Sequence, residues 1–371
     1  MAERAGIEAA RELTPPVLNA MHAEALFRLS LPLSLGGAAL PPAQLARVTE
    51  TIATADASAA WCLGQGLGCA MSGAFLDDAP ARHVFGAHDS VLAWGAGNQG
   101  KAIAAHGGYR ISGTWQFASG SKHATWLGAH CKVYQADGTT PKLDAAGKPA
   151  VRTALLPRER ATLADDWYVM GLRGTRSEGY SVDDLFVEEA YTLNREAREE
   201  CRQDEPLFIF PTTNVYAAVF SGVALGIARG GLDDLRALAE HKTARGAPSA
   251  LKDSPVFHTD LALLEARYGA ARAFQQTTLD EIWDAVCATR TLSLEQRGRI
   301  RLATTHAINE ATDVMEKVYR MAGATAIFQN QPFERRFRDA HAVSQQVQGR
   351  VTNYETVGRL MMGLDVPMMF M

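Results

Sequence analysis

The hydrophobic pattern of the chain changes twice, and these changes restrict its fold more than any single residue does. In the N-terminal part, apolar side chains recur at helical spacing, as in QLARVTETIATADASAAWCLGQGLGCAMSGAFL. In the middle, short alternating segments, glycine pairs and turn signals are typical of antiparallel strands. Helical spacing then returns and continues to the end. The sequence therefore predicts an N-terminal all-α domain (1–92), a central antiparallel β domain (93–197) and a C-terminal four-helix bundle (198–371).

Composition restricts the class of protein. The chain has 371 residues, of which 47% are hydrophobic and 21% charged, as in a globular protein with a large core. A formal net charge of −4 gives no reason to expect a nucleic acid partner. We expect no apolar run long enough to span a bilayer, and the N-terminus has no apolar signal-peptide core. The sequence thus predicts a cytoplasmic protein without a membrane partner.

Several common catalytic and metal-binding motifs are missing. The five cysteines form no CxxC pair and the ten histidines form no HExxH, so we predict no metal site. There is no GxSxG, which removes support for acyl transfer. The letters GAGNQG match GxGxxG, but KAIAAHGGYRISG follows them with a strand–turn–strand pattern, whereas a dinucleotide fingerprint opens a helix. We expect a glycine-rich loop there.

The segment SGTWQFASGSKHATWLGAHCKV has strand-like ends and a small, polar centre. That centre, from Ala118 to His123, is longer than the two-residue turn that a simple hairpin needs. Tryptophans flank it on both sides. The segment is therefore either a long, solvated loop or a wall shaped to receive a flat aromatic ligand.

Four segments, in the same order along almost the whole chain, resemble the acyl-CoA dehydrogenase superfamily of flavoproteins. LFRLSLPLSLGGAALPPAQLARVTETIATADASAAWCL resembles its N-terminal helical domain, and SGTWQFASGSKHATW its flavin-facing strand and loop. MGLRGTRSEGYSVDDLFVEEAYTL resembles the G-x-R-x-T/S-x-S segment, and VYRMAGATAIFQNQPFERRFRDAHAVSQQ the C-terminal bundle signature. The resemblance implies an acyl-CoA dehydrogenase-like fold, FAD or FMN between the β domain and the bundle, and a homotetramer.

The resemblance assigns cofactor contacts to the WQFASGS segment. Gly120 would let the backbone approach the flavin ring, and the hydroxyls of Ser119 and Ser121 would hydrogen-bond its polar edge near N5 or O4. Trp115 would supply a stacking or edge contact, and Phe117 is placed with it among the cofactor-binding residues. The alternative for Trp115 is a place in the strand core.

Two further regions are assigned to the cofactor by the same resemblance. Arg173, Thr175 and Ser177 would line the flavin–substrate region, although a β-turn rich in small polar residues is the alternative. Arg245 would contact a cofactor phosphate, in some members across a subunit boundary. A solvated charge at a helix end is the alternative for Arg245.

An acyl-CoA dehydrogenase needs a carboxylate base that removes the proton α to the thioester. In many members this glutamate follows shortly after an Arg-Asp pair in the C-terminal bundle. Here Arg338-Asp339 is followed by AHAVSQQVQG, and the next acid is Glu355, well past the usual place. Other members carry the base on an earlier helix, so the dehydrogenase remains an alternative.

The local sequence is closer to the two-component flavin monooxygenase branch, which includes p-hydroxyphenylacetate hydroxylase and dibenzothiophene monooxygenase. The motifs TWQFASG and FRDAHAVSQQ both resemble this branch. Its members take reduced flavin from a separate reductase, form a C4a-hydroperoxyflavin with O2 and transfer one oxygen atom to an aromatic or heteroatom substrate. That chemistry needs a dry pocket with hydrogen-bond donors beside the ring.

Two positions depart from this branch. Members commonly carry a histidine on the helix after the first Trp motif, where this chain has Cys69, and another late in the Arg-Asp helix, where it has Gln346. We take Ser119, Cys69, Gln346 and His341 as the candidate catalytic residues. If this alignment holds, acid–base chemistry is reduced or has moved to His123 or His341.

The leading functional hypothesis is a reduced-flavin-dependent monooxygenase that acts on a small aromatic or heteroatom substrate, with O2 and a flavin reductase as partners. The second is an acyl-CoA dehydrogenase with bound FAD. The third is a flavin-fold protein that serves for binding or as a scaffold and has lost its chemistry together with the two histidines.

Overall fold

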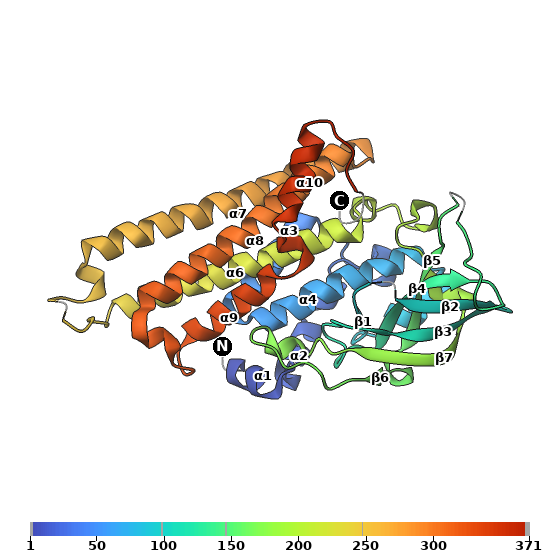
Figure 1. The fold of residues 1–371 in the computed structure, drawn as a ribbon, viewed down its shortest axis with the longest axis horizontal. Coiled ribbons are helices and arrows are strands. Elements are labelled where there is room, and N and C mark those ends of the chain that lie inside the picture. Colours follow the sequence, from blue (N-terminus) through green and yellow to red (C-terminus); the bar gives the residue numbers. More distant parts are fainter. Residues whose placement is uncertain (1–2, 98, 145–146, 247, 368–371) are drawn as a thin grey trace.

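A computed structural model describes residues 3–97, 99–144, 147–246 and 248–367. Long helices lie side by side at one end of the molecule and a twisted β-sheet lies at the other, with α4 running from one to the other (Figure 1). The helices are α1 (Arg4–Ala10), α2 (Pro15–Ala23), α3 (Pro42–Ala55), α4 (Ala57–Ala70), α5 (Asp78–Phe85), α6 (Thr212–Ala239), α7 (Pro255–Thr289), α8 (Leu294–Ala322), α9 (Pro332–Ser344) and α10 (Thr352–Met361). This is the acyl-CoA dehydrogenase-like arrangement that the sequence predicts.

The sheet is mixed, whereas the sequence predicts an antiparallel one. Its order is β6-β7-β3-β2-β4-β5-β8, and β1 pairs with β4 beside this path. The pairs β1/β4 and β2/β4 are parallel and the others antiparallel. The strands are β1 (Leu92–Trp94), β2 (Gly100–Ala105), β3 (Gly108–Trp115), β4 (Trp126–Tyr134), β5 (Val151–Pro157), β6 (Thr162–Leu163), β7 (Tyr180–Glu188) and β8 (Thr192–Leu193). Because a strand and no helix begins at Gly100, the GxGxxG letters do not form a dinucleotide fingerprint.

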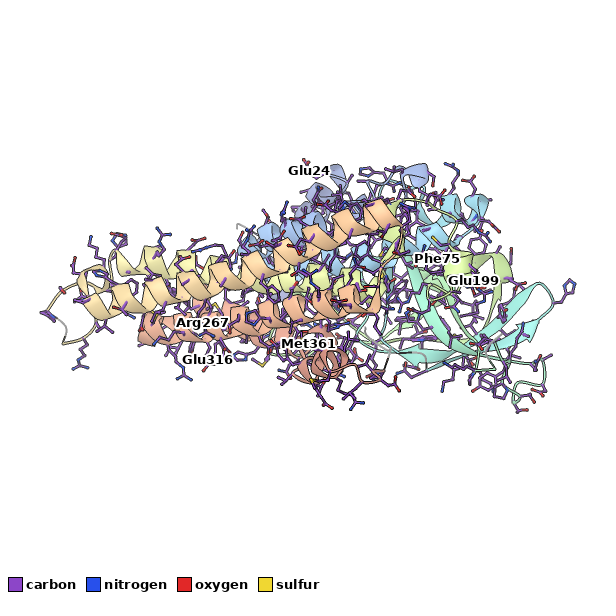
Figure 2. All side chains as sticks on the ribbon, turned by 90° about the horizontal axis from the view of Figure 1, so that it is seen from above. Glu24, Phe75, Glu199, Arg267, Glu316 and Met361 are labelled. Atoms are coloured by element: carbon purple, nitrogen blue, oxygen red, sulfur yellow. The ribbon has the colours of Figure 1, made fainter. Side chains whose placement is uncertain are left out.

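The helix α6 is the central helix of the bundle. Its 28 residues are apolar enough to cross a membrane by length and composition, so the expectation that no run reaches this length is wrong. However, 89% of its apolar window is buried inside the protein. Figure 2 shows the helices from above, with Arg267 on α7 and Glu316 on α8. The apolar length of α6 is therefore used to pack neighbouring helices.

The helix α3 packs against α6 so closely that their contact requires glycine. A Cβ atom at Gly222 of α6 would lie 2.3 Å from the carbonyl oxygen of Ala46 and 2.5 Å from Thr49 Oγ1, both on α3. The Thr49 hydroxyl also donates to the carbonyl oxygen of Val219, at 2.8 Å. The sequence places α3 in the N-terminal domain, but in the structure it is a full neighbour of the C-terminal bundle.

Buried charges connect α9 to the rest of the chain. Arg335 Nη2 donates to Asp56 Oδ2 at 2.6 Å, and Asp56 Oδ1 in turn accepts from the backbone N–H of Ala59 as the N-cap of α4. One turn along α9, Asp339 Oδ1 accepts from the backbone N–H of Leu172, also at 2.6 Å. We call Arg335, Asp339, Asp56 and Leu172 the α9 cluster. It joins the C-terminal bundle, α4 and the segment before β7.

A glycine pair tests the α3–α6 contact. We expect Gly222→Ala to lower the free energy of unfolding, because the new Cβ would overlap backbone atoms that cannot rotate away. Gly269→Ala on α7 is the matched control, since nothing lies within 4 Å of its Cβ position. It should raise the free energy of unfolding by about 0.5–1 kcal/mol through helix propensity. Urea unfolding checks both, and equal effects would contradict the close approach.

Candidate functional site

Three hydroxyl groups from two distant segments meet in the interior beside α4. Ser119 Oγ lies 2.6 Å from Ser177 Oγ, which lies 2.7 Å from Thr175 Oγ1. The indole N–H of Trp61 on α4 donates to Ser119 Oγ at 3.0 Å, and the Thr175 hydroxyl donates to the carbonyl oxygen of Leu172 at 2.8 Å. The structure thus brings three of the predicted site residues together. We call Trp61, Ser119, Ser177 and Thr175 the hydroxyl chain.

The two ends of the hydroxyl chain fix the direction of its hydrogen bonds. An indole N–H can only donate and a carbonyl oxygen can only accept, while each hydroxyl has a single hydrogen. Because Thr175 gives its hydrogen to the carbonyl oxygen of Leu172, it accepts from Ser177. Ser177 then accepts from Ser119. The hydroxyl hydrogen of Ser119 is therefore used inside the protein, and its oxygen has one lone pair left for a ligand.

The backbone beside Ser119 is arranged for close approach. Gly120 has a φ of +81° and its N–H donates to the carbonyl oxygen of Thr175 at 3.0 Å. Phe117 also has a positive φ, of 61°, and the residue is 63% exposed. Ser121 is fully buried, with its hydroxyl 3.4 Å from the carbonyl oxygen of Arg176. The loop presents an exposed aromatic residue and two buried hydroxyls within five residues.

Trp115 lies in the strand core. It is fully buried, its indole N–H donates to the carbonyl oxygen of His130 at 2.9 Å, and its ring stacks on Tyr180 at 5.3 Å. A stacking partner for a ligand needs an exposed face, which Trp115 does not have. Its proposed cofactor contact is thus not supported, and Phe117 is the aromatic ring that this loop exposes.

The two predicted arginines lie in different surroundings. Arg173 contacts Glu8 at 3.4 Å and donates to the carbonyl oxygen of Val169 at 3.0 Å, with 42% of its side chain exposed. Arg245 is exposed in the connection between α6 and α7. That connection lies at the end of the bundle away from the sheet (Figure 1). Within one chain, Arg245 therefore cannot reach the hydroxyl chain.

Cys69 belongs to a buried polar group between α4 and α6. Its sulfur lies 3.5 Å from the Tyr216 hydroxyl and accepts from the Gln65 amide at 3.5 Å, while the same amide donates to Tyr216 at 3.0 Å. Burial raises the pKa of the Cys69 thiol to about 12. The thiol is therefore protonated at neutral pH and is no acid–base substitute for a histidine.

The end of α9 differs from the expectation. The helix ends at Ser344, so Gln346 does not lie on it but begins a short helical turn, where its side chain accepts from the N–H of Gln348 at 2.6 Å. His341 lies in the last turn of α9 beside the ring of Phe337, at 4.3 Å, and its Nε2 is buried without a partner in the described part of the chain. The two residues therefore occupy different elements.

His123 follows the site loop directly and is packed against Gly120. A Cβ atom at Gly120 would lie 3.0 Å from its Nε2, and its ring is 5.8 Å from that of Phe27. Burial, with a smaller contribution from His22, lowers the pKa of His123 to about 4. His123 is neutral at neutral pH, so its role as a relocated general acid has no electrostatic support.

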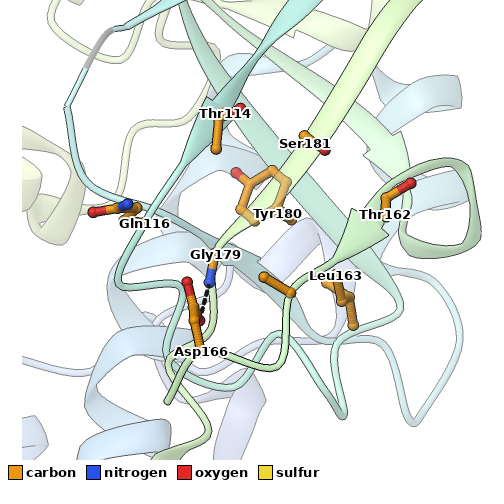
Figure 3. A pocket seen from close by; sticks show the side chains of 9 residues that line it. Thr114, Gln116, Thr162, Leu163, Asp166, Gly179, Tyr180 and Ser181 are labelled. Atoms are coloured by element: carbon orange, nitrogen blue, oxygen red, sulfur yellow. Dashed lines mark hydrogen bonds between the residues drawn. The ribbon is translucent and has the colours of Figure 1, made fainter. Parts of the chain in front are cut away.

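A pocket opens on the sheet side of the same two segments (Figure 3). Gln116 and Gly179 line it, and each is close in sequence to a residue of the hydroxyl chain. Asp166 holds this wall, because its Oδ1 accepts from the N–H of Gly179 at 3.1 Å. The remaining lining residues are Thr114, Thr162, Leu163, Ala164, Tyr180 and Ser181.

These groups fit a flavin ring in their chemistry. A ring of this kind has an aromatic face and a polar edge, and the loop offers the exposed Phe117 ring, the close backbone of Gly120 and the free lone pair of Ser119. Trp61, which anchors the hydroxyl chain, is absent from the predicted site residues, although it lies in the segment that resembles the family's N-terminal helical domain. The fold and these residues together define a flavoprotein of the acyl-CoA dehydrogenase type.

Comparisons with known proteins agree with this class. Residues 218–348 match the family model described as "Acyl-CoA dehydrogenase, C-terminal domain". An indole-3-acetate monooxygenase from Pseudomonas putida is 32% identical over 355 residues, which are 95% of this chain and 88% of that protein. A 3-HSA hydroxylase structure from Rhodococcus sp. RHA1 has a TM-score of 0.89 at 24% identity and covers 100% of this chain and 95% of its own.

XiaF from Streptomyces sp., solved in complex with FADH2 and glycerol, has a similar fold. Its TM-score is also 0.89, at 24% identity, with 98% of this chain and 92% of that chain covered. The chain belongs to the flavin-dependent monooxygenases of the acyl-CoA dehydrogenase superfamily. It is therefore a flavin-dependent oxidoreductase.

The low pKa of His123 predicts a pH dependence of stability. Its folded pKa, about 4, lies below the ordinary value of 6.5, so its contribution is fully present above pH 6.5 and is lost as the pH falls towards 4. We expect His123→Phe to reduce the loss of unfolding free energy between pH 7 and pH 4.5. Urea unfolding at both pH values measures this, with His106→Phe, in the exposed β2–β3 turn, as control. An unchanged pH dependence would contradict the burial of a neutral imidazole.

Proposed function

We propose that this protein is the oxygenase component of a two-component monooxygenase. It takes reduced FAD or FMN from a separate flavin reductase and, with O2, oxygenates a small aromatic or heteroatom-containing substrate. Ser119, Ser177 and Thr175 would hold the polar edge of the flavin, and Phe117 would face its ring. Bound reduced flavin supplies the two electrons that activate O2.

The direction of the hydroxyl chain carries this proposal. Ser119 gives its hydrogen to Ser177 and keeps a lone pair, so it is ready to accept a hydrogen bond and not to donate one. Reduced flavin has an N–H at N5, where the oxidised ring has only an acceptor. The arrangement therefore favours the reduced cofactor, as expected of an enzyme that receives it from a reductase.

The chain's own residues keep this region dry and poor in mobile protons. Ser119, Ser177 and Thr175 are 6%, 3% and 1% exposed. Nearby, the Cys69 thiol stays protonated and His123 stays neutral at neutral pH. A site without a mobile proton and with little water protects a reactive oxygen species from premature decay.

The dehydrogenase alternative lacks its base on α9. Asp339 is the acid nearest to the expected place, but one of its oxygens accepts from the Leu172 N–H and the other lies 3.7 Å from Arg335. A carboxylate held in this way is part of the buried structure. By contrast, a relative named as a monooxygenase acts on the aromatic compound indole-3-acetate. We therefore propose an aromatic substrate for this protein as well.

We also propose that the protein is cytoplasmic and forms a homotetramer. The helix α7 exposes the apolar side chains of Val256, Leu263 and Phe274, at 71%, 59% and 41%. Burial of such side chains against a second copy would be favourable. In such an assembly, Arg245 could reach only the flavin of another subunit.

Stopped-flow mixing of the protein, loaded anaerobically with reduced FMN or FAD, with oxygenated buffer tests the proposal. We expect a transient flavin absorbance that outlasts that of free flavin, because the buried site slows its decay. Rapid reoxidation without a transient, together with reduction of bound oxidised flavin by an acyl-CoA, would establish the dehydrogenase instead. Lack of flavin binding in both redox states would identify the scaffold.

Ser177→Ala tests the direction of the hydroxyl chain. The substitution removes the acceptor of the Ser119 hydrogen, which then becomes free to donate to the oxidised ring. We expect the preference for reduced over oxidised flavin, measured as the ratio of dissociation constants, to narrow by about 2- to 10-fold, the effect of one hydrogen bond. Ser112→Ala on β3, a residue outside both the hydroxyl chain and the pocket, is the control. A preference that does not change would place the flavin elsewhere.

A further inference from the structure

Arg301 on α8 is a buried cation whose partners are all neutral. It is 1% exposed. Its Nη1 donates to the side-chain oxygen of Gln348 and its Nη2 to the hydroxyl of Thr213, at 3.2 Å, while its Nε is buried without a partner. Within the described residues, no carboxylate forms an ion pair with it. A buried charge that is not compensated costs free energy.

The other buried arginines do not share this property. Arg335 is 8% exposed and donates to Asp56 at 2.6 Å, and Arg336 is 4% exposed and donates to Asp234, also at 2.6 Å. In both of these cases the chain supplies a carboxylate. Arg301 has the burial of these structural arginines but lacks the counter-charge, which a bound anion would supply.

Arg297 adds positive charge beside Arg301, and the residue after Thr213 on α6 carries a buried amide without partners in the described chain. Burial, with a smaller contribution from Arg297 one turn earlier on α8, lowers the pKa of Arg301 to about 10. Asn214, which follows Thr213 on α6, is 1% exposed, and both atoms of its amide lack a partner within the described chain. Buried polar atoms without partners are rare in folded proteins and often mark a ligand.

A row of side chains connects this region to the hydroxyl chain. Thr213, Tyr216 and Phe220 are spaced three and four residues apart, which places them on one face of α6. The rings of Tyr216 and Phe220 stack at 5.4 Å, and that of Phe220 stacks on Trp61 at 4.1 Å. Trp61 donates to Ser119. At 1.5 Å per residue, Thr213 lies about 10 Å along α6 from Phe220, a distance comparable to the length of a small aromatic acid.

The second connection runs through the segment that follows α9. Gln348, whose side-chain oxygen accepts from Arg301, donates its backbone N–H to the side-chain oxygen of Gln346 at 2.6 Å. Gln346 is one of the candidate catalytic residues from the sequence, and the structure places it just after the end of α9. Arg301 is therefore linked to the candidate site along α6 and, through Gln348, to a candidate catalytic residue after α9.

We propose that Arg301 is a specificity-determining residue that binds the anionic group of the substrate, and that the substrate class is an aromatic carboxylic acid. The inference rests on the proposed function. Gln348 and Thr213 fix the guanidinium, whose Nε and remaining Nη hydrogens form the planar donor pattern that a carboxylate matches. The aromatic part of the acid would lie along Tyr216 and Phe220, towards Ser119.

Binding titrations under nitrogen test this without turnover. Full-length protein loaded with reduced FMN is titrated with indole-3-acetate, phenylacetate and benzoate, and with the amide of each acid. We expect at least one acid to bind about 10-fold or more tightly than its amide. Arg301→Met should weaken the binding of that acid by about 10- to 100-fold. It should change the affinity for the corresponding amide by less than about threefold. Arg301→Lys should keep part of the preference.

Matched variants and readouts exclude the other roles of Arg301. Arg299→Met removes an exposed arginine of the same helix, paired with Glu281, and should leave both affinities unchanged. In the absence of ligand, Arg301→Met should be as stable to urea as the wild type or more so, because it removes an uncompensated buried charge. An equal loss of acid and amide binding, or a large loss of stability in both Arg301 variants, would overturn the proposal.

Two further results would also overturn it. Wild-type protein that binds no acid better than its amide has no anion site for the substrate. Weaker binding of reduced FMN but not of reduced riboflavin to Arg301→Met would assign the guanidinium to the cofactor phosphate. Because these titrations need no O2, they separate this proposal from the proposed function: an Arg301-dependent acid preference without a transient in stopped flow would refute only the latter.

Discussion

The ion pair between Arg335 and Asp56 is the interaction on which the site depends. Both side chains are buried, so loss of either partner would leave an unpaired charge in the interior, at a cost of about 3–5 kcal/mol. Asp56 is also the N-cap of α4, the helix that carries Trp61. One turn further along α9, Asp339 holds the N–H of Leu172, whose carbonyl oxygen ends the hydroxyl chain. Both ends of that chain are thus fixed by one cluster on α9.

The buried arginines are of two kinds, and the difference between them underlies the proposed role of Arg301. Arg335 and Arg336 have carboxylate partners and join α9 to α4 and α6, so their charges are satisfied in the free protein. Arg301 has neutral partners only, and no carboxylate among the described residues balances its charge. Burial raises the pKa of Asp339 to about 6, and Arg335 and the backbone N–H of Leu172 oppose this shift.

Sequence patterns predicted the parts of the site that are local. The WQFASG and G-x-R-x-T/S-x-S segments each carry hydroxyls at fixed spacing, and Ser119, Thr175 and Ser177 do meet in the structure. The role of Trp115 could not be assigned from sequence. Alternation along a strand shows that one face is buried, but it does not show which face a ligand contacts. Gln346 was misplaced because α9 ends at Ser344, earlier than its helical pattern suggests.

By itself, the sequence determined the order of helices, sheet and bundle, since hydrophobic periodicity is a local property that each segment carries alone. The family of flavoproteins also followed from short motifs. Only the tertiary structure decided the mixed sheet, the place of α3 beside α6, the partners of Trp61 and the burial of Arg301 beside Thr213. These features join residues far apart in the chain, and the free energy of such contacts depends on packing that no single segment encodes.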